Sequence, residues 1–314
     1  MTYLEPNAAY EGRAETLIKK LQPNSVALSF WSPPYFVGKE YEKDATYTTW
    51  QSLLKSVIAG HTPILKPGGF MVVNIADILC FKDPELPRFQ AMSLSQQRSS
   101  VTREMVLEAK AKHPNYNRDQ MAELLGCSEQ TVDRRLNGNN IRGGKYETQT
   151  RVKLVGGSLE QYAYDAGLYL YDHRIWAKDP AWANSKWTSN SLKAVSEYED
   201  LYVFWKPGEM VIDRSKLQPK EWQDWGYRGI WFIDSVRANN DHEAKFPLKL
   251  AERVIRLFSS PGDVVLDPFL GSGTTAVAAL RHNRQYLGFE KEAHYVVLAR
   301  RNIENASAQL SLLA

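Results

Sequence analysis

Short apolar runs alternate with amphipathic segments along much of this chain. Residues 25–31, 70–75 and 264–267 are largely apolar runs, which are typical of strands buried on both faces of a sheet. Residues 48–64 and 245–258 instead carry apolar side chains at helical spacing. Because strand, helix and strand follow one another, the pattern predicts an α/β protein built on a mostly parallel, doubly wound sheet.

Weaker patterns supply further elements. Residues 10–22 carry apolar side chains on one helical face, which predicts a short helix. Residues 173–178 and 200–206 predict strands that return to the sheet. Near the carboxyl end, residues 274–281 predict a helix and residues 285–289 predict another strand. We therefore expect one large sheet that draws its strands from both ends of the chain.

The middle of the chain differs in character. Residues 80–100 are polar and contain several prolines. Three short helical patterns then follow, at residues 101–112, 118–125 and 128–136. The last two are separated by a glycine-containing turn, and Ser128 is a suitable cap for the second, as in a helix-turn-helix. A helical hairpin used for packing or for binding a partner fits the same pattern. We predict a helical subdomain inserted at residues 81–150, between residues 1–80 and 151–314.

Aromatic residues concentrate in residues 160–235, which contain seven of the nine tryptophans. Large aromatic side chains are usually core residues, so most of them should fill the interior. Trp182, Trp187 and Trp225 lie in polar segments and are candidates for stacking on nucleic-acid bases.

The formal net charge of +3 does not by itself indicate a nucleic-acid binder. A local basic patch does indicate contact with nucleic acid, because residues 134–153 contain six basic residues and a single acid, Glu147. The basic residues are Arg134, Arg135, Arg142, Lys145, Arg151 and Lys153. We expect contacts with phosphates from this segment.

Composition also excludes several classes of protein. No apolar run reaches the length of a membrane span, and the first residues lack the features of an export signal, so a cytoplasmic location is expected. The two cysteines, Cys80 and Cys127, are far apart and not at metal-ligand spacing. This argues against a disulfide framework and a zinc site, and no metal is expected.

A tight glycine loop follows the apolar run near the carboxyl end. Asp267 ends the strand, and Gly271 and Gly273 let the backbone approach a ligand closely. The helix that begins at Thr274 offers free N–H groups, and Glu290, at the end of the next strand, can accept hydrogen bonds from both hydroxyls of a ribose. The loop lacks both the Gly-x-Gly-x-x-Gly of dinucleotide sites and the lysine of a P-loop. The pattern therefore predicts a nucleoside site without a phosphate cradle.

The strand at residues 25–31 runs into Ser32, Pro33, Pro34 and Tyr35. Two prolines cannot donate hydrogen bonds to the ladder, so the chain must leave the sheet here. The turn offers a hydroxyl, a backbone carbonyl and an aromatic face, which are the groups that a flipped nucleobase needs. Taken alone, these four residues also fit an ordinary proline turn at a strand end.

Together these motifs resemble the S-adenosylmethionine-dependent DNA amino-methyltransferases. Residues 32–35 are similar to the catalytic motif of that family, residues 267–275 to its cofactor loop, and Glu290 to its ribose-binding acid. Residues 242–247 are similar to the segment that leads into the cofactor site. The catalytic motif precedes the cofactor motif, which is the order found in the beta group. The resemblance implies a Rossmann-like methyltransferase fold, S-adenosylmethionine as cofactor and double-stranded DNA as substrate.

The resemblance also implies a role for individual residues. The catalytic residues would be Ser32, Pro33, Pro34 and Tyr35. The cofactor-binding residues would be Phe246, Pro247, Asp267, Pro268, Phe269, Gly271, Ser272, Gly273, Thr274 and Glu290. From the basic residues we expect DNA contacts at Lys39, Arg134, Arg135, Arg142 and Lys145. Residues 1–80 would form the catalytic half, and residues 151–314 the return strands, the target-recognition region at roughly 178–240 and the cofactor-binding half.

The expected chemistry is direct transfer to an amino nitrogen. The flipped base would stack on Tyr35 while the Ser32 hydroxyl and the Pro33 carbonyl accept hydrogen bonds from its exocyclic amino group. Neither Cys80 nor Cys127 follows a proline, so covalent attack on C5 of cytosine is not expected. Within the family, a serine at the first motif position more often accompanies cytosine. N4 of cytosine is therefore the preferred acceptor, and N6 of adenine is the alternative.

Two hypotheses from other classes fit parts of the pattern. One is a helix-turn-helix transcriptional regulator whose α/β domain senses a nucleoside, although a sensor has no need of acceptors beside an aromatic ring. The other is methylation of RNA or of a protein glutamine. For a DNA methyltransferase, the partner could be a restriction endonuclease acting on the same site, or the enzyme could be solitary, and it could be a monomer or a homodimer.

Overall fold

The computed structural model describes residues 2–34, 46–80, 89–93, 99–137, 144–148, 151–180, 194–236 and 245–312. Within residues 78–80, 89–93, 144–148 and 151–152 it describes the backbone alone. The chain forms an α/β unit, made of Met1–Phe81, Arg151–Trp182 and Val195–Ala314, and a helical unit, made of Lys82–Thr150 and Ala183–Ala194. Five residues of interest lie outside the described ranges, namely Tyr35, Lys39, Arg142, Trp182 and Trp187.

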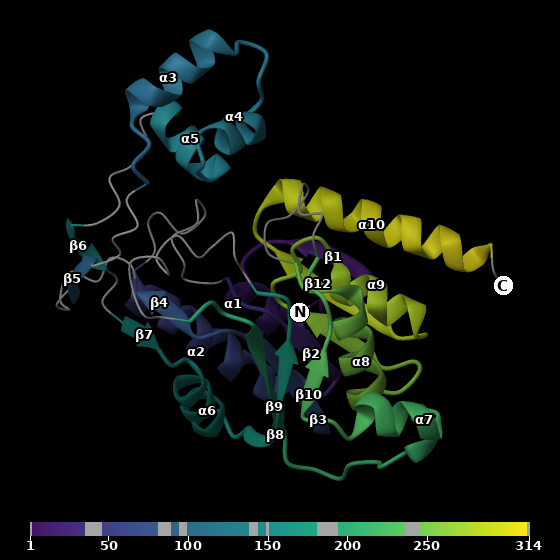
Figure 1. Ribbon diagram of the computed structural model, residues 1–314. Helices are drawn as coiled ribbons and strands as arrows, with labels where there is room; N and C mark the ends of the chain where they lie inside the picture. Colours follow the sequence, from purple (N-terminus) through teal and green to yellow (C-terminus); the bar gives the residue numbers. More distant parts are fainter. Residues whose placement is uncertain are drawn as a thin grey trace. The chain divides into compact units, whose positions relative to one another are not determined.

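Within the described ranges, eight strands form the central sheet of the α/β unit (Figure 1). In spatial order they are β1 (Ala8–Glu11), β12 (Gln285–Glu290), β11 (Val264–Asp267), β2 (Val26–Trp31), β3 (Leu65–Ile75), β9 (Tyr198–Trp205), β8 (Tyr169–Ala177) and β10 (Ile230–Phe232). Neighbouring strands run parallel except at β9, which is antiparallel to both β3 and β8. The predicted mostly parallel sheet is confirmed.

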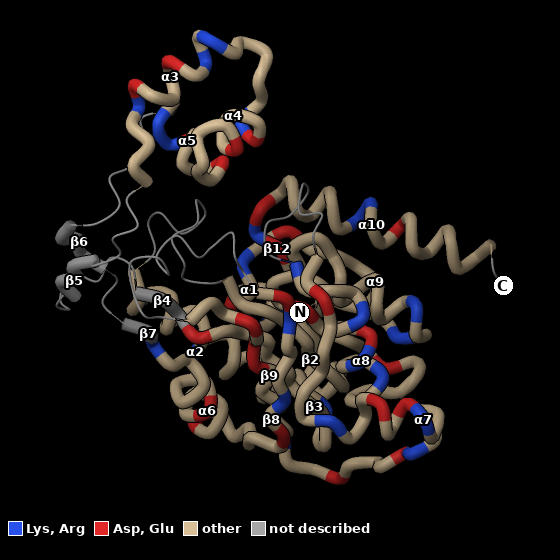
Figure 2. The backbone as a smooth tube through the Cα atoms, viewed as in Figure 1, with Lys and Arg blue, Asp and Glu red and all other residues tan. Residues whose placement is uncertain are grey.

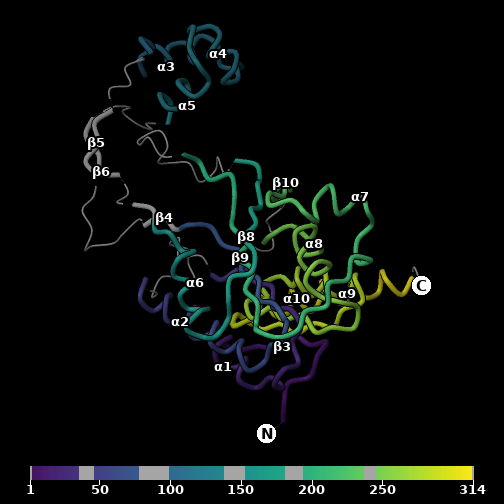
Figure 3. Tube along the Cα trace, turned by 90° about the horizontal axis from the view of Figure 1, so that it is seen from below, coloured from purple at the N-terminus to yellow at the C-terminus, as the bar shows by residue number. Residues whose placement is uncertain are grey.

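Helices cover both faces of this sheet, so its central strands are buried on both sides. Every residue of β2 and of β11 is buried, which explains why the sequence shows them as continuous apolar runs. Figure 3 shows α2 and α6 on one side of the strands and α8, α9 and α10 on the other. The α/β unit is therefore doubly wound.

The helices of the two faces contribute to separate parts of the core. On one face lie α1 (Ala14–Leu17), the 3₁₀ turn η1 (Ile18–Lys20), α2 (Tyr47–Ile64) and α6 (Gly156–Asp165). On the other face lie α8 (Leu248–Phe258), α9 (Thr274–Arg281) and α10 (Ala293–Ser311). Short elements complete the unit: η5 (Arg214–Lys216), α7 (Pro219–Glu221), the π turn η6 (Trp222–Gly226) and the ribbon of β4 (Ile78–Cys80) with β7 (Arg151–Lys153).

The helical unit contains α3 (Arg103–Lys112), α4 (Arg118–Leu124) and α5 (Glu129–Asn137), together with the ribbon of β5 (Phe89–Ser93) and β6 (Gly144–Thr148). The helices enclose a small core of Val101, Val106, Met121, Ala122 and Val132. Side chains of Thr102, Asn117 and Ser128 cap their amino ends. Gly126, in the turn between α4 and α5, has a φ of 62°, a left-handed conformation that favours glycine. Residues 99–137 carry six basic and six acidic side chains, and Figure 2 shows both signs on these helices.

The structure corrects two expectations from the sequence. Residues 10–22 were predicted as one helix, but Ala8–Glu11 is the edge strand β1, and the helical part begins only at Ala14. Trp225 was a candidate for base stacking, but it is 6% exposed and lies edge-on to Trp231, with a ring-centroid distance of 6.0 Å. It is therefore a core residue. Among the described residues, no helix is long and apolar enough to cross a membrane.

Candidate active site

The parallel pairing of β2 with β11 brings the two predicted motifs together. Leu28 pairs with Val265 and Ser29 with Leu266, so the carboxyl ends of both strands meet at one edge of the sheet. Ligands in open α/β sheets bind at this edge. A cavity of about 210 Å³ lies there, and the turn after β2 and the loop after β11 both line it. Two segments from opposite ends of the chain thus share one site.

The turn after β2 contributes Ser32, Pro33 and Pro34 to the cavity wall. The Pro34 carbonyl accepts a hydrogen bond of 2.7 Å from Nε1 of Trp50, a buried residue of α2. This bond ties the turn to the helix that covers one face of the sheet. It therefore fixes the path of the backbone just after Ser32, where the chain leaves the ladder.

Asp267 organises the loop after β11 from a position that is 2% exposed. One carboxylate oxygen accepts from the Phe269 N–H at 3.0 Å, and the other accepts from the Thr275 hydroxyl at 2.7 Å. Burial raises the pKa of Asp267 to about 7, the nearby Glu290 adds to this rise, and the two hydrogen bonds oppose it. Asp267 thus holds both ends of the glycine loop.

The loop requires glycine at two places. Gly271 has a φ of 51° and Gly273 a φ of 88°, both in the left-handed region that side chains disfavour. Gly273 directly precedes α9, so the chain turns sharply from the sheet into the helix. The first turn of α9, whose N–H groups have no partner within the helix, therefore begins at the cavity, and Thr274 is part of its wall.

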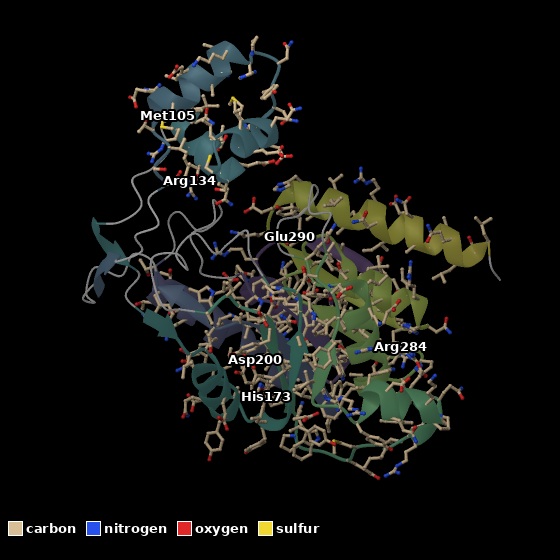
Figure 4. The ribbon with its side chains drawn as sticks, in the orientation of Figure 1. Met105, Arg134, His173, Asp200, Arg284 and Glu290 are labelled. Carbon is tan, nitrogen blue, oxygen red and sulfur yellow. The ribbon has the colours of Figure 1, made fainter. Side chains whose placement is uncertain are left out.

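Glu290, labelled in Figure 4, lies at the carboxyl end of β12 and also lines the cavity. Its Oε2 atom accepts from the Gly271 N–H at 3.0 Å, and its Oε1 atom accepts from the Glu292 N–H at 2.9 Å. Each carboxylate oxygen has a second lone pair. The carboxylate therefore fixes the loop and can still accept hydrogen bonds from a ligand.

Most of the predicted cofactor residues lie on the cavity wall. These are Phe246, Asp267, Pro268, Phe269, Gly271, Ser272, Thr274 and Glu290. Pro247 and Gly273 do not line it: Pro247 precedes α8 and its carbonyl accepts from Leu250, and Gly273 caps α9. Phe246 contacts Phe30 with a ring-centroid distance of 4.8 Å, which joins the segment before α8 to β2.

The sequence did not indicate one part of the wall, residues 12–15, which follow β1 and include the start of α1. Because β1 is parallel to β12, Glu11 pairs with Glu290 and the Gly12 N–H donates to the Glu290 carbonyl at 2.8 Å. The segment after β1 therefore joins the same edge. Arg13 and Glu15 there form an ion pair of 2.6 Å. Further along the chain, the wall includes Leu53, Lys245 and Tyr295.

The predicted DNA-contact residues separate into different environments. Nε of Arg135 donates to the Val101 carbonyl at 2.9 Å, so this side chain helps to hold the helical unit together. Arg134, labelled in Figure 4, makes only a long contact of 3.5 Å with Gln130 on its own helix. Lys145 is described in its backbone alone. Within the described residues, Arg134 is thus the predicted DNA contact whose side chain is not used by the fold.

A doubly wound, mostly parallel sheet with a ligand cavity at its carboxyl edge defines a Rossmann-like nucleoside-binding fold. The family described as DNA methylase, which comprises N6 and N4 methyltransferases, matches residues 26–301. The chain belongs to this family, the S-adenosylmethionine-dependent DNA amino-methyltransferases.

Individual relatives agree with this assignment. Type II methyltransferase M.BglI of Bacillus subtilis is 60% identical over 303 residues, which cover 96% of this chain and 87% of the relative. Type II beta methyltransferase M.BslI of Bacillus sp. (strain NEB-606) is 24% identical over 308 residues, covering 92% of this chain and 27% of M.BslI. Among solved structures, TTHA0409 from Thermus thermophilus, complexed with S-adenosyl-L-methionine, has a TM-score of 0.60 and 25% identity, covering 95% of this chain and 93% of that one. The family and the fold predicted from the motifs are confirmed.

Proposed function

We propose that this protein transfers a methyl group from S-adenosylmethionine to the exocyclic N4 of a flipped cytosine in duplex DNA. The observation that carries the proposal is the shared cavity, in which the turn at Ser32 meets the loop at Asp267. Methyl transfer between two bound molecules needs this adjacency, because the donor and the acceptor must be aligned before the reaction. Alignment of that kind contributes on the order of 7–11 kcal/mol over the free bimolecular reaction.

The residues of the cavity fit S-adenosylmethionine. Glu290 would accept hydrogen bonds from the ribose hydroxyls through the lone pairs that Gly271 and Glu292 do not use. Gly271 has no side chain and lies in the wall, so the nucleoside can approach the backbone closely. Phe246 and Phe269 provide apolar surface for the remainder of the ligand. When bound, this cofactor supplies an electrophilic methyl group.

The target base would lie on the Ser32 side of the same cavity. The Ser32 hydroxyl and the Pro33 carbonyl would accept hydrogen bonds from the amino group, and Tyr35 would stack on the ring. These bonds orient the nitrogen lone pair toward the methyl donor. The nitrogen would form a bond to the methyl carbon while the bond from that carbon to the cofactor sulfur breaks, and the nitrogen would then lose a proton.

Cytosine is preferred over adenine because Ser32 occupies the first motif position, where the family more often pairs serine with cytosine. N6 of adenine remains the alternative, since a hydroxyl and a carbonyl accept from either amino group. Membership of the DNA methylase family supports an enzyme rather than a nucleoside-sensing regulator. The type II relatives support modification of DNA within a restriction system, with an endonuclease for the same site as partner.

The helical unit is proposed as a second contact with DNA. Its charges balance over residues 99–137, so attraction to phosphates would not come from net charge. The proposal depends instead on the helix-turn-helix arrangement of α4 and α5 and on the side chain of Arg134. In such motifs the second helix enters the major groove.

The decisive experiment is nucleoside analysis of DNA after incubation with the protein and isotopically labelled S-adenosylmethionine. We expect label in N4-methylcytosine, whereas N6-methyladenine without N4-methylcytosine would reassign the base. RNA and protein acceptors run in parallel test the other substrate classes. A Ser32→Ala variant should slow transfer on the order of 100-fold with little change in cofactor affinity, in line with the loss of one preorganised hydrogen bond. An Asp267→Ala variant should instead weaken cofactor binding, and equal effects of both changes on cofactor affinity would contradict these roles.

A further inference from the structure

One side of α5 packs against the core of the helical unit, and this fixes which side faces away from the core. Val132 is fully buried in the core that α5 shares with α3 and α4, and Leu136 packs against the same core. Consecutive helical residues are about 100° apart, so the positions two before and two after Val132 lie opposite that core. These positions hold Gln130, which is exposed, and Arg134, which is partly exposed and labelled in Figure 4.

The turn before α5 sets the direction of the helix. Residues 125–128 join α4 to α5, and the Cys127 N–H donates to the Ala122 carbonyl at 2.9 Å. At the start of α5, the Ser128 hydroxyl accepts from the Thr131 N–H at 3.3 Å. Two short helices joined by such a turn form a helix-turn-helix, whose second helix enters the major groove of DNA with its amino-terminal residues against the base edges.

The two acids of α5 are already used within the helical unit. Asp133 accepts from Arg118 of α4 at 2.8 Å and from Nδ2 of Asn137 at 2.8 Å, so its charge is offset. Glu129 lies in the first turn of α5, where a carboxylate stabilises the amino end of a helix. It is three positions before Val132 and therefore lies nearer to the core side of the helix than to the outer side.

The outer side of α5 thus presents Gln130 and Arg134, one helical turn apart. The contact between them is 3.5 Å, which is long for a hydrogen bond, so their polar groups can bind a ligand. Residues four apart are about 6 Å apart along a helix, whereas successive base pairs of DNA are about 3.4 Å apart. The two side chains would therefore reach base pairs within about two steps of each other.

These two residue types suit the major-groove edges of purines. An arginine donates two hydrogen bonds to O6 and N7 of guanine. The glutamine amide donates to N7, which both purines carry, and its oxygen accepts from N6 of adenine. Arg118, whose side chain is 62% exposed, begins α4, and the first helix of such a motif crosses the phosphate backbone. The unit therefore offers groups for bases on α5 and a cation for phosphate on α4.

We propose that α5 carries part of the target recognition of this enzyme, with Arg134 reading a guanine and Gln130 a neighbouring purine in the major groove. This inference rests on the proposed function, because it concerns the duplex that the enzyme methylates. It goes beyond a second contact with DNA, since phosphate contacts position a protein without carrying sequence information. Residues 178–240 are the recognition region that the family resemblance implies, and α5 adds a second reader.

The test begins with the target of the wild type. The full-length protein is incubated with unmethylated genomic DNA and S-adenosylmethionine, and sequencing that detects methylated bases gives the sequence that it modifies. Transfer of labelled methyl groups is then measured on a duplex with this target and on duplexes in which each base pair of the target is exchanged in turn. The ratio of kcat/KM between the target and an exchanged duplex measures discrimination at that base pair.

Arg134→Gln should relax discrimination at one guanine-containing base pair. The ratio of kcat/KM there should fall by about 10- to 100-fold, which is the discrimination that a bidentate contact contributes, and the ratios at other base pairs should stay within about twofold. Gln130→Ala should relax discrimination at a base pair within about two steps of the first. Both variants should keep the unfolding temperature and the S-adenosylhomocysteine affinity of the wild type, because both side chains lie opposite the core.

Arg103→Gln is the matched control, because it removes the same charge from the same unit. Arg103 is exposed at the first position of α3, the helix that precedes the helix-turn-helix. Loss of a phosphate contact weakens binding uniformly across sequences, whereas loss of a base contact relaxes specificity at one position. Arg103→Gln should therefore leave every ratio of kcat/KM unchanged, whatever its effect on the rate itself.

The outcomes distinguish the two proposals. A wild-type protein that transfers no label to DNA contradicts the proposed function itself. An active wild type whose ratios are unchanged in Arg134→Gln and Gln130→Ala overturns only the reading role of α5. A uniform fall on every duplex would also overturn it, because α5 would then contact phosphates alone. If Arg134→Gln lowers the unfolding temperature, Gln130→Ala, which changes an exposed side chain, decides whether α5 reads the target.

Discussion

Replacing Glu290 by glutamine tests how the cavity recognises a nucleoside. The carboxylate accepts from the N–H groups of Gly271 and Glu292, so loss of either bond affects the stability of the loop. The remaining lone pairs are those proposed to accept from the two ribose hydroxyls. Glutamine exchanges one oxygen for an NH₂ group, which cannot accept, and therefore removes one of these ribose contacts together with one of the two loop contacts.

The size of the effect follows from that single contact. A hydrogen bond to a charged group contributes about 1.5–3 kcal/mol, and about 1.4 kcal/mol corresponds to a tenfold change in affinity. We therefore expect Glu290→Gln to weaken binding of S-adenosylhomocysteine by roughly 10- to 100-fold. Glu252→Gln is the control, because Glu252 lies on α8 outside the cavity wall and contacts Arg281 at 3.6 Å.

Calorimetric titration with two ligands separates the ribose contact from the loop contact. One ligand is S-adenosylhomocysteine, and the other is its analogue without the two ribose hydroxyls. The larger part of the loss in affinity for Glu290→Gln should appear only with the intact ribose. An equal loss for both ligands would mean that Glu290 acts through the loop alone, and no loss with either ligand would refute its role.

Three further predictions concern stability and DNA binding. A Cβ atom on Gly288 would lie 2.6 Å from the Leu270 side chain, so Gly288→Ala should lower the free energy of unfolding by about 1–3 kcal/mol, measured by urea denaturation. Burial lowers the pKa of His61 to about 4 from 6.5. As the pH drops from 6.5 to 4, the unfolded chain therefore binds a proton that the folded protein does not bind, and the free energy of unfolding should fall. A His61→Gln variant should show a shallower fall, and an identical pH profile would contradict this assignment. Arg135→Ala should destabilise the helical unit by about 1 kcal/mol, through loss of its bond to a backbone carbonyl. Arg134→Ala should instead keep thermal stability and weaken DNA binding at low salt. If Arg134→Ala lowered thermal stability while Arg135→Ala weakened only DNA binding, the distinction between the two residues would be refuted.

The parts of the fold that the sequence predicted share one physical property. β2, β3 and β11 are buried on both faces over most of their length, so they appear as apolar runs that need no knowledge of their neighbours. The glycine loop was equally visible, because its left-handed residues, Gly271 and Gly273, favour glycine. Constraints of this kind act on single residues, so they can be recognised in the sequence without knowledge of the tertiary structure.

Features that depend on partners far away in the chain were not visible in this way. β1 has four residues, and its position is decided by pairing with β12 at the other end of the chain. Residues 12–15, which follow β1, consequently reach the cavity wall without a signal in their own sequence. Trp225 has polar neighbours in sequence, yet the π turn η6 directs it against Trp231. In these cases tertiary pairing overrides the local pattern.

The buried contacts of Glu199 with Asn74 and Lys178 show a further reason why polar residues near the edge of the sheet are missed when the chain is read in order. In a parallel sheet, polar residues at the carboxyl ends of strands are the usual candidates. β9 runs antiparallel to its neighbours, so its amino end, not its carboxyl end, lies at that edge. Glu199, the second residue of β9, thereby joins residues at or just beyond the ends of the other strands. In a mixed sheet, a polar residue at the start of an antiparallel strand is therefore as strong a site candidate as one at the end of a parallel strand.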